Sequence, residues 1–206
     1  MSLGPPACDH PRTQAERRAA TRAALIGAAR PLFASRGYAA VGTEEIVRAA
    51  GVTRGALYHH FAGKQGLFRE VFEVVEQELL AAIGAAIEVA APTSPLGALA
   101  VGSDVILAGA SDPGVAQIAL IDAPAVLGWE LWREIGVSYG LGLTEGVLTA
   151  AIEAGQLAPQ PTRPLAHVLL GALDEAALYV ARAPDVDAAR VEMRAAIRTL
   201  LSALGH

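Results

Sequence analysis

Apolar residues recur at helical spacing along almost the whole chain, and no sustained period-two run of β-branched residues interrupts them. Between residues 12 and 36, for example, Leu25, Ala29 and Phe33 mark one face of an amphipathic helix, and Gly37 is predicted to end it. Alanine, the strongest helix former, is abundant throughout. The sequence therefore predicts an all-α fold.

Two short helices are predicted on either side of a tight turn. Thr43 is predicted to cap a helix that ends at Ala50, because Gly51 breaks it. Thr53 is predicted to cap a second short helix that ends near His60. Two short helices joined by such a turn form a helix-turn-helix, which presents its second helix to the major groove of DNA.

The charge is divided unevenly along the chain, whose formal net charge is −5. Residues 1–70 hold ten Lys and Arg against five Asp and Glu, whereas the remaining residues hold six against sixteen. Uneven halves can arise by chance, but a basic N-terminal part on an acidic body is typical of a protein whose first part contacts phosphate.

The second short helix carries polar and aromatic groups on its outer side. Leu57 and Phe61 are predicted to face the core, which turns Tyr58 and His59 toward solvent. Tyrosine and histidine donate hydrogen bonds to DNA phosphate, and arginine reads the O6 and N7 atoms of guanine, so Arg54 at the start of this helix is a candidate for base recognition. Packing against the first helix is the alternative for the tyrosine and the histidines.

The stretch from Thr43 to Leu67 closely resembles the signature of TetR-type transcriptional regulators, and Phe33 and the pair Gly37-Tyr38 match the pattern before it. The resemblance covers about residues 15–70. It implies a homodimer whose two recognition helices enter successive major grooves of a palindromic operator in double-stranded DNA. It also implies a three-helix DNA-binding head joined to a larger all-helical domain for ligand binding and dimerisation.

The resemblance assigns DNA contacts residue by residue. It implies that Thr43 and Lys64 bind phosphate, the latter at a helix N-terminus, although a solvated surface lysine is the alternative for Lys64. Ala56 departs from the family, which often has a hydroxyl residue there, so the family's polar contact is not carried over to this position, and apolar contact with a thymine methyl is the alternative. The complete set of implied DNA-binding residues is Thr43, Thr53, Arg54, Gly55, Tyr58, His59, His60 and Lys64.

The acidic part resembles the family more loosely, through residues 121–133, and this similarity implies a helical regulatory domain. Small side chains leave room there for an apolar pocket, with Trp129, Trp132, Tyr139 and His167 as candidate ligand contacts. Core or interface packing is the alternative for the tryptophans, and a hydrogen-bonded structural role is the alternative for the histidine.

The last two predicted helices have broad apolar faces that suit a symmetric four-helix dimer interface. Burial within one subunit is the alternative. The residues that define these faces are Leu165, Val168, Leu169, Ala172, Leu173, Ala176 and Val180 in the first helix, and Met193, Ile197, Leu200 and Leu204 in the second.

These patterns predict a flexible N-terminal arm over residues 1–11, a helix-turn-helix domain over 12–68 and a regulatory domain over 69–206. The boundary falls within a fourth helix that is predicted to start near Lys64, so a continuous helix is expected to join the two domains.

Motifs for catalysis, for a cofactor and for a metal are missing from the sequence. Cys8 with His10, and the pair His59-His60, do not supply a tetrahedral metal set. A single cysteine favours a reducing cytoplasm, and the absence of an uninterrupted apolar run of about 18 residues predicts that no segment spans a membrane.

The sequence thus predicts a cytoplasmic, homodimeric repressor that a small apolar or amphipathic molecule releases from DNA. The alternative is a helical small-molecule carrier or enzyme with an unused helix-turn-helix.

Overall fold

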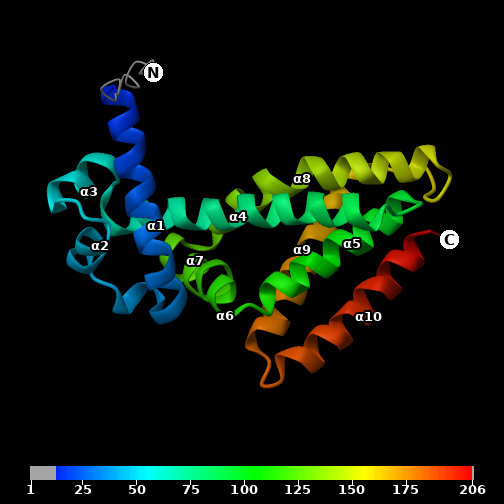
Figure 1. The fold of residues 1–206 in the computed structure, drawn as a ribbon. Coiled ribbons are helices and arrows are strands. Elements are labelled where there is room, and N and C mark those ends of the chain that lie inside the picture. Colours follow the sequence, from blue (N-terminus) through cyan, green and yellow to red (C-terminus); the bar gives the residue numbers. More distant parts are fainter. Residues whose placement is uncertain (1–12, 206) are drawn as a thin grey trace, which may run out of the picture.

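The computed structural model describes residues 13–205, and these residues are helical apart from short connections (Figure 1). The all-α prediction is confirmed. The arm predicted over residues 1–11 lies outside the described residues. In chain order the elements are α1 (Gln14–Ala40), α2 (Thr43–Ala49), α3 (Arg54–His60), α4 (Gly63–Ala90), α5 (Pro95–Ala110), α6 (Pro113–Val115), the π-helical segment η1 (Ala116–Asp122), α7 (Ala123–Leu127), α8 (Trp129–Glu153), α9 (Thr162–Arg182) and α10 (Val186–Leu204).

The first helix begins later and ends later than predicted. Thr13 and Glu16 form a capping box, in which each side chain accepts a hydrogen bond from the other residue's backbone N–H, and this fixes the start of α1 at Gln14. Gly37 has φ 75° and ψ 161°, so it bends the helix sharply, but helical structure resumes and continues to Ala40. Gly37 is therefore a kink within α1 and not its end.

The helix-turn-helix follows the prediction closely. Thr53 caps α3 as expected, because its hydroxyl accepts a hydrogen bond from the backbone N–H of Ala56 at 3.3 Å. The residue that caps α2 was predicted wrongly: Gly42 is the N-cap and Thr43 is the first residue inside the helix. Gly51 has φ 66°, a conformation in the turn that favours glycine.

A single long helix joins the head to the body. α4 runs unbroken from Gly63 to Ala90, and it crosses the boundary predicted from the charge shift (Figure 1). Its first half contributes Leu67, Phe68 and Phe72 to the core of the head, where the Phe68 ring meets the Phe33 ring of α1 edge to face, with 5.3 Å between centroids. Its second half packs along α5 in the body.

Two helices of the body are longer and more apolar than expected. α8 and α9 each contain an 18-residue window with a mean hydropathy of 1.3, so each is long and apolar enough to cross a membrane by length and composition alone. The segments Pro95–Ala110 and Pro113–Leu127 meet at an angle of 81°, and together they would count as a third such element. Neither window is an uninterrupted apolar run, because every such window in α8 contains Glu145 and every one in α9 contains Asp174 and Glu175. Only 28% and 33% of the windows in α8 and α9 are buried within the chain, so much of their apolar surface faces outward.

Candidate nucleic-acid interface and ligand cavity

The recognition helix α3 presents the face that the sequence predicted. Leu57 is fully buried against Ile46 and the rest of the head core, whereas Tyr58 is 51% exposed and His59 is also exposed. Thr53, Arg54 and Gly55, at the N-terminal end of the helix, are exposed as well, and His60 is half-buried. Six neighbouring residues of this helix and its N-cap are thus accessible, fully or in part, to a binding partner.

Arg54 is held in place by weak, exchangeable contacts. Its guanidinium forms an ion pair with Glu44 of α2 at 3.0 Å, and it lies over the Tyr58 ring at 5.6 Å from the centroid. Both partners of the ion pair are more than half exposed, and such pairs contribute little to stability. Arg54 can therefore exchange Glu44 for another partner at small cost.

Two arginines of α1, which the sequence analysis missed, lie beside the histidines of α3. Arg17 and Arg18 line a shallow surface depression together with His59 and His60. Burial lowers the pKa of His60, and the charges of His59, Arg18 and Arg22 lower it further. The sequence signal was the run of arginines at residues 17, 18 and 22, but periodicity alone could not place them against α3.

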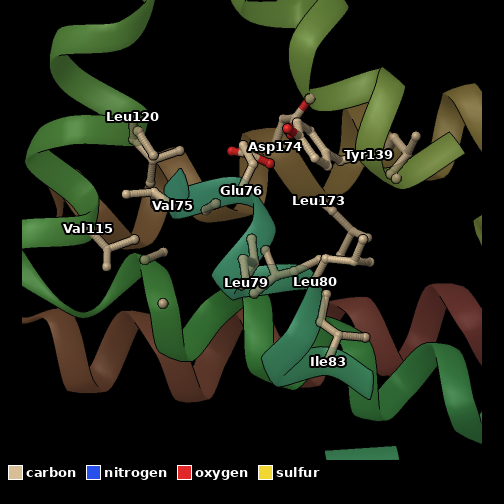
Figure 2. Close-up of a pocket in the computed structure, with 18 of the residues that line it drawn as sticks. Val75, Glu76, Leu79, Leu80, Ile83, Val115, Leu120, Tyr139, Leu173 and Asp174 are labelled. Carbon is tan, nitrogen blue, oxygen red and sulfur yellow. The ribbon is translucent and has the colours of Figure 1, made fainter. Parts of the chain in front are cut away.

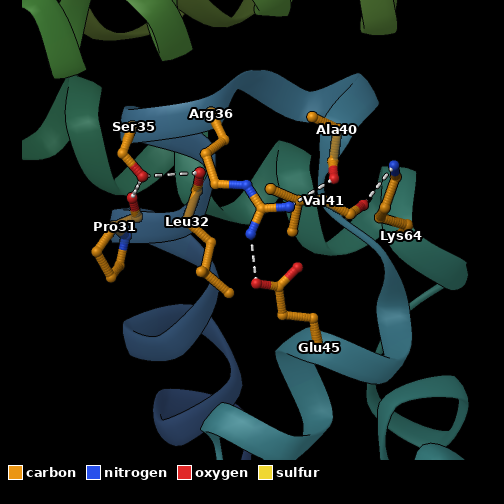
Figure 3. A network of polar contacts seen from close by, with 8 residues as sticks. All are labelled: Pro31, Leu32, Ser35, Arg36, Ala40, Val41, Glu45 and Lys64. Carbon is orange, nitrogen blue, oxygen red and sulfur yellow. Dashed lines mark hydrogen bonds and ion pairs between the residues drawn. The ribbon is translucent and has the colours of Figure 1, made fainter.

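Lys64 is engaged within the protein in the structure (Figure 3). Its Nζ donates hydrogen bonds to the backbone carbonyls of Tyr38 at 2.8 Å and Val41 at 2.9 Å, and it lies 3.9 Å from the centroid of the Tyr38 ring. Burial lowers its pKa. The same end of α1 is also held by Arg36, which donates to the carbonyl of Ala40 and pairs with Glu45 of α2. The sequence offered two alternatives for Lys64, a phosphate contact and a solvated surface lysine. A solvated lysine does not describe this arrangement. The phosphate contact stays a prediction.

The body contains a mostly apolar cavity of about 120 Å³, partly open to solvent, between α4, α5, α6, η1, α8 and α9. Figure 2 shows Val75, Leu79 and Ile83 reaching it from α4, with Leu120 of η1 and Leu173 of α9 opposite. A concave, mostly apolar space with a few polar groups is typical of a small-molecule site.

Two of the four predicted ligand contacts line this cavity. Trp132 is buried, and its indole Nε1 donates to the carbonyl of Ala119 at 2.9 Å; Tyr139 lies at the cavity wall and accepts from Gln77 at 3.0 Å. Trp129 is 61% exposed and does not line the cavity, although its ring lies 4.8 Å from the Trp132 ring, centroid to centroid, in a tilted arrangement. His167 is exposed and also lies outside it, so the structure places neither of these two at the cavity.

Three charged residues at the cavity were missed by the sequence analysis: Glu76, Arg133 and Asp174. Arg133 forms an ion pair with Asp174, whose pKa burial nonetheless raises to about 6. Burial, reinforced by the charge of Asp174, raises the pKa of Glu76 to about 7. Glu76 lies four residues after the buried Phe72, so a charged residue on the apolar face of this helix was the available signal.

The segment η1 contacts both the cavity and the head. Ala119 and Leu120 line the cavity. Two residues after Leu120, the carboxylate of Asp122 accepts a hydrogen bond from the backbone N–H of Tyr38, near the C-terminal end of α1. A second hydrogen bond joins the same two parts of the protein: the side-chain amide of Gln65, near the start of α4, donates to the carbonyl of Val126 in α7 at 2.7 Å.

The apolar faces predicted on the last two helices are divided between the interior and the surface. Ala176, Val180 and Ile197 are buried within the chain, in the core that α5, α9 and α10 share. Val168 is 67% exposed and Leu200 is 52% exposed, so part of each predicted face points outward. Tyr179, which the sequence analysis did not include, is exposed on the same side of α9.

Groups of three or more His, Cys, Asp or Glu residues that could hold a metal ion are not found among residues 13–205.

Comparisons with known proteins identify both parts of the chain. Residues 25–71 match the family described as "Bacterial regulatory proteins, tetR family", and residues 96–204 match "Tetracyclin repressor-like, C-terminal domain". The Tn10 TetC protein of Escherichia coli is 28% identical over 158 residues, which cover 77% of this chain and 79% of that protein. The regulator AcrR of Shigella flexneri is 42% identical over 59 residues, but these span only 27% of its length.

Solved structures resemble the whole chain. A TetR-family transcriptional regulator from Pectobacterium atrosepticum superposes with a TM-score of 0.81 at 31% identity, covering 94% of this chain and 97% of that one. RolR, solved in complex with resorcinol, gives a TM-score of 0.71 at 21% identity over 92% of this chain and 96% of its own. The second likeness shows the shared fold alone.

Proposed function

The chain belongs to the tetR family of DNA-binding transcriptional regulators, which are not enzymes, and we propose that it is a homodimeric repressor of a palindromic operator. A small apolar or amphipathic molecule in the cavity would release it from DNA. We further propose that residues 12–68 form the DNA-binding domain, that residues 69–206 form the regulatory domain, and that the protein acts in the cytoplasm.

The exposed face of α3 supports the proposed DNA contacts. Arg54 lies at the N-terminal end of the recognition helix, the end that reaches base edges in this class of motif, and its present partner is easily replaced. Tyr58, His59 and His60 follow along the helix, and Arg17 and Arg18 of α1 extend the positive surface. We propose that these residues bind DNA together with Thr43, Thr53 and Gly55, and that Lys64 positions the end of α1.

The exposed apolar residues of α9 and α10 support a dimer. Val168, Tyr179 and Leu200 are large hydrophobic side chains that a monomer leaves in water. We propose that a second copy of the chain covers them through a two-fold axis, so that four helices pack together. Such a dimer presents two recognition helices to half-sites about 34–36 Å apart, one helical turn of DNA, or a multiple of that distance.

The contacts of η1 support the regulatory step. A ligand in the cavity touches Ala119 and Leu120, and Asp122 at the end of the same segment holds the head. If the ligand prefers a dimer whose reading heads are wrongly spaced, it weakens operator binding by the same factor by which DNA weakens ligand binding.

The test begins with selection of a preferred duplex from a random library by the purified full chain. Fluorescence anisotropy then measures the affinity for this duplex and for a scrambled duplex between 50 and 200 mM salt, and we expect steep weakening with salt and a clear preference for the selected duplex. No duplex binding at low salt would instead support a helical carrier.

Sedimentation velocity tests the dimer. Leu200→Glu places a charge at the proposed interface, and we expect monomers that bind the selected duplex weakly. Val89→Glu is the matched control, because Val89 is 88% exposed and belongs to α4, not to the proposed interface helices. Dimers that persist in the Leu200 variant would refute this interface.

A further inference from the structure

We infer that the cavity takes a small organic monocation, an amine with an apolar body of about the size of a benzene ring, and that the Glu76 carboxylate holds its ammonium group. This inference deepens the proposed function, because it rests on the cavity being the effector site. It comes from the charges and the size of the cavity.

The charged groups at the cavity do not balance. They come from three elements: Glu76 from α4, Arg133 from α8 and Asp174 from α9. Arg133 is committed to Asp174 by their ion pair. The Glu76 carboxyl makes no hydrogen bond or ion pair with any residue of the described range 13–205, and Asp174 lies beside it (Figure 2).

Glu76 is half-buried, so its carboxylate keeps some contact with solvent, but an unpaired carboxylate against a mostly apolar wall is still costly, and a bound cation removes that cost. The cost is visible in the raised pKa values of both carboxyls, for which burial is the main cause. A ligand with one positive charge neutralises the set formed by two carboxylates and one guanidinium. A third carboxylate brought by an anionic ligand would add to the existing repulsion.

The size and lining of the cavity set the rest of the ligand. The remaining wall is built mainly of aliphatic side chains, with Trp132 and Tyr139 at one side. A volume of about 120 Å³ is close to that of engineered apolar cavities of about 150 Å³, which bind benzene. The cavity therefore fits a single aromatic ring or a short alkyl chain.

The test uses three probes of nearly equal shape: benzylamine, benzyl alcohol and benzoate. Isothermal titration calorimetry on the full chain at pH 8 measures their affinities, and Trp132 at the cavity wall allows a fluorescence check. We expect benzylamine to bind at least tenfold more tightly than benzyl alcohol, with benzoate weakest. Equal affinities for the amine and the alcohol, or no binding of the amine, would overturn the inference.

Glu76→Gln keeps the shape of the side chain and removes its charge. We expect this variant to lose the preference for the amine, so that amine and alcohol bind within about twofold of each other, while the alcohol binds as it does to the wild type. Glu88→Gln is the matched control, because Glu88 is an exposed residue of the same helix. An unchanged preference in the Glu76 variant would contradict the assignment.

The affinity for the amine also depends on pH. The ammonium favours the ionised form of Glu76, so binding releases a proton wherever the free carboxyl is protonated. We expect the affinity to fall as pH drops from 8 to 5.5 in the wild type and to stay nearly flat in Glu76→Gln. Binding to the selected duplex without any amine is measured in parallel, which separates failure of this inference from failure of the proposed function.

Discussion

The backbone N–H of Tyr38 donates a hydrogen bond to the carboxylate of Asp122 at 2.7 Å, and this bond joins the head to the body across 84 residues of sequence. It forms where α1 bends at Gly37, whose φ of 75° turns the chain toward η1. A Cβ added at Gly37 would lie 3.1 Å from the amide nitrogen of the Gln117 side chain, which shows how closely the two segments approach. The short segment η1 therefore connects the cavity wall to the head, in addition to the continuous helix α4.

Replacement of Asp122 by Ala is expected to destabilise the protein by about 1.5–3 kcal/mol, because a charge-assisted hydrogen bond is lost and the Tyr38 N–H keeps no partner. Urea unfolding measures the loss, and hydrogen exchange is expected to be faster at the Tyr38 amide. Asp187→Ala is the control: Asp187 is 86% exposed in its ion pair with Arg190, so we expect little change. Equal stability of the two variants would show that this link is weak.

Arg54→Ala is expected to relax the base preference at one position in each half-site, at a cost of about 1–3 kcal/mol for the preferred sequence. The reason is that a bidentate contact to guanine discriminates between bases, whereas a phosphate contact does not. Competition binding with a set of single-base operator variants measures this. If the substitution weakens every sequence by the same factor, Arg54 contacts phosphate and not a base.

Lys64→Met is expected to destabilise the protein by about 1–3 kcal/mol, because the carbonyls of Tyr38 and Val41 lose a charged donor that joins α4 to the end of α1. The salt dependence of operator binding distinguishes this from a DNA contact. We expect the slope of log affinity against log salt to stay unchanged, since no phosphate contact is removed. A slope reduced by about one would instead support the phosphate contact that the family resemblance implies.

The pH dependence of DNA binding is expected to report on His60. Burial and the nearby His59, Arg18 and Arg22 lower its pKa in the free protein, whereas a bound phosphate raises it, so the complex holds more protons than the free protein. Operator affinity is therefore expected to rise as pH falls from 8 through the usual histidine range near 6.5. Anisotropy measurements on the wild type and His60→Gln test this. We expect a shallower profile in the variant, and an unchanged profile would exclude His60.

Glu76 is expected to reduce the stability of the free protein at alkaline pH. Its pKa is about 7 in the folded chain, above the ordinary value of 4.5, so the folded state binds the proton more tightly and stability falls as pH rises between these values. Glu76→Gln removes this loss. We expect the variant to exceed the wild type by about 1–3 kcal/mol in urea unfolding at pH 8, and by much less at pH 5. Equal gains at both pH values would point to packing rather than to charge.

The helical fold and the recognition helix could be predicted because they depend on local patterns. Leu57 and Phe61 lie four residues apart, so their burial requires that Tyr58 and His59 face outward, whatever the rest of the chain does. Thr53 caps α3 through its own side chain, again a local interaction. The same reasoning predicted the N-cap of α2 one residue too late, at Thr43 and not at Gly42, because a glycine can take the N-cap conformation without a capping side chain.

The cavity depended on contacts between residues distant in sequence. Trp129 and Trp132 are the same residue type three positions apart, so the sequence could not distinguish their roles. Only Trp132 is buried in the body, where its indole Nε1 donates a hydrogen bond to the Ala119 carbonyl. Glu76 and Asp174 lie on α4 and α9, and no periodicity reveals that the two helices bring their carboxyls into one apolar space.

Sequence by itself therefore determined the helices, the outward face of the recognition helix and the charge of each half, because these follow from neighbours within one or two helical turns. Tertiary structure alone decided which groups meet. It joins Lys64 to two carbonyls at the end of α1 and Asp122 to Tyr38, and within residues 13–205 it leaves Glu76 without a paired cation. The physical reason is that burial and pairing depend on which surfaces pack together. Packing joins segments that are distant in the chain, and the local sequence pattern of one segment does not show which other segment it contacts.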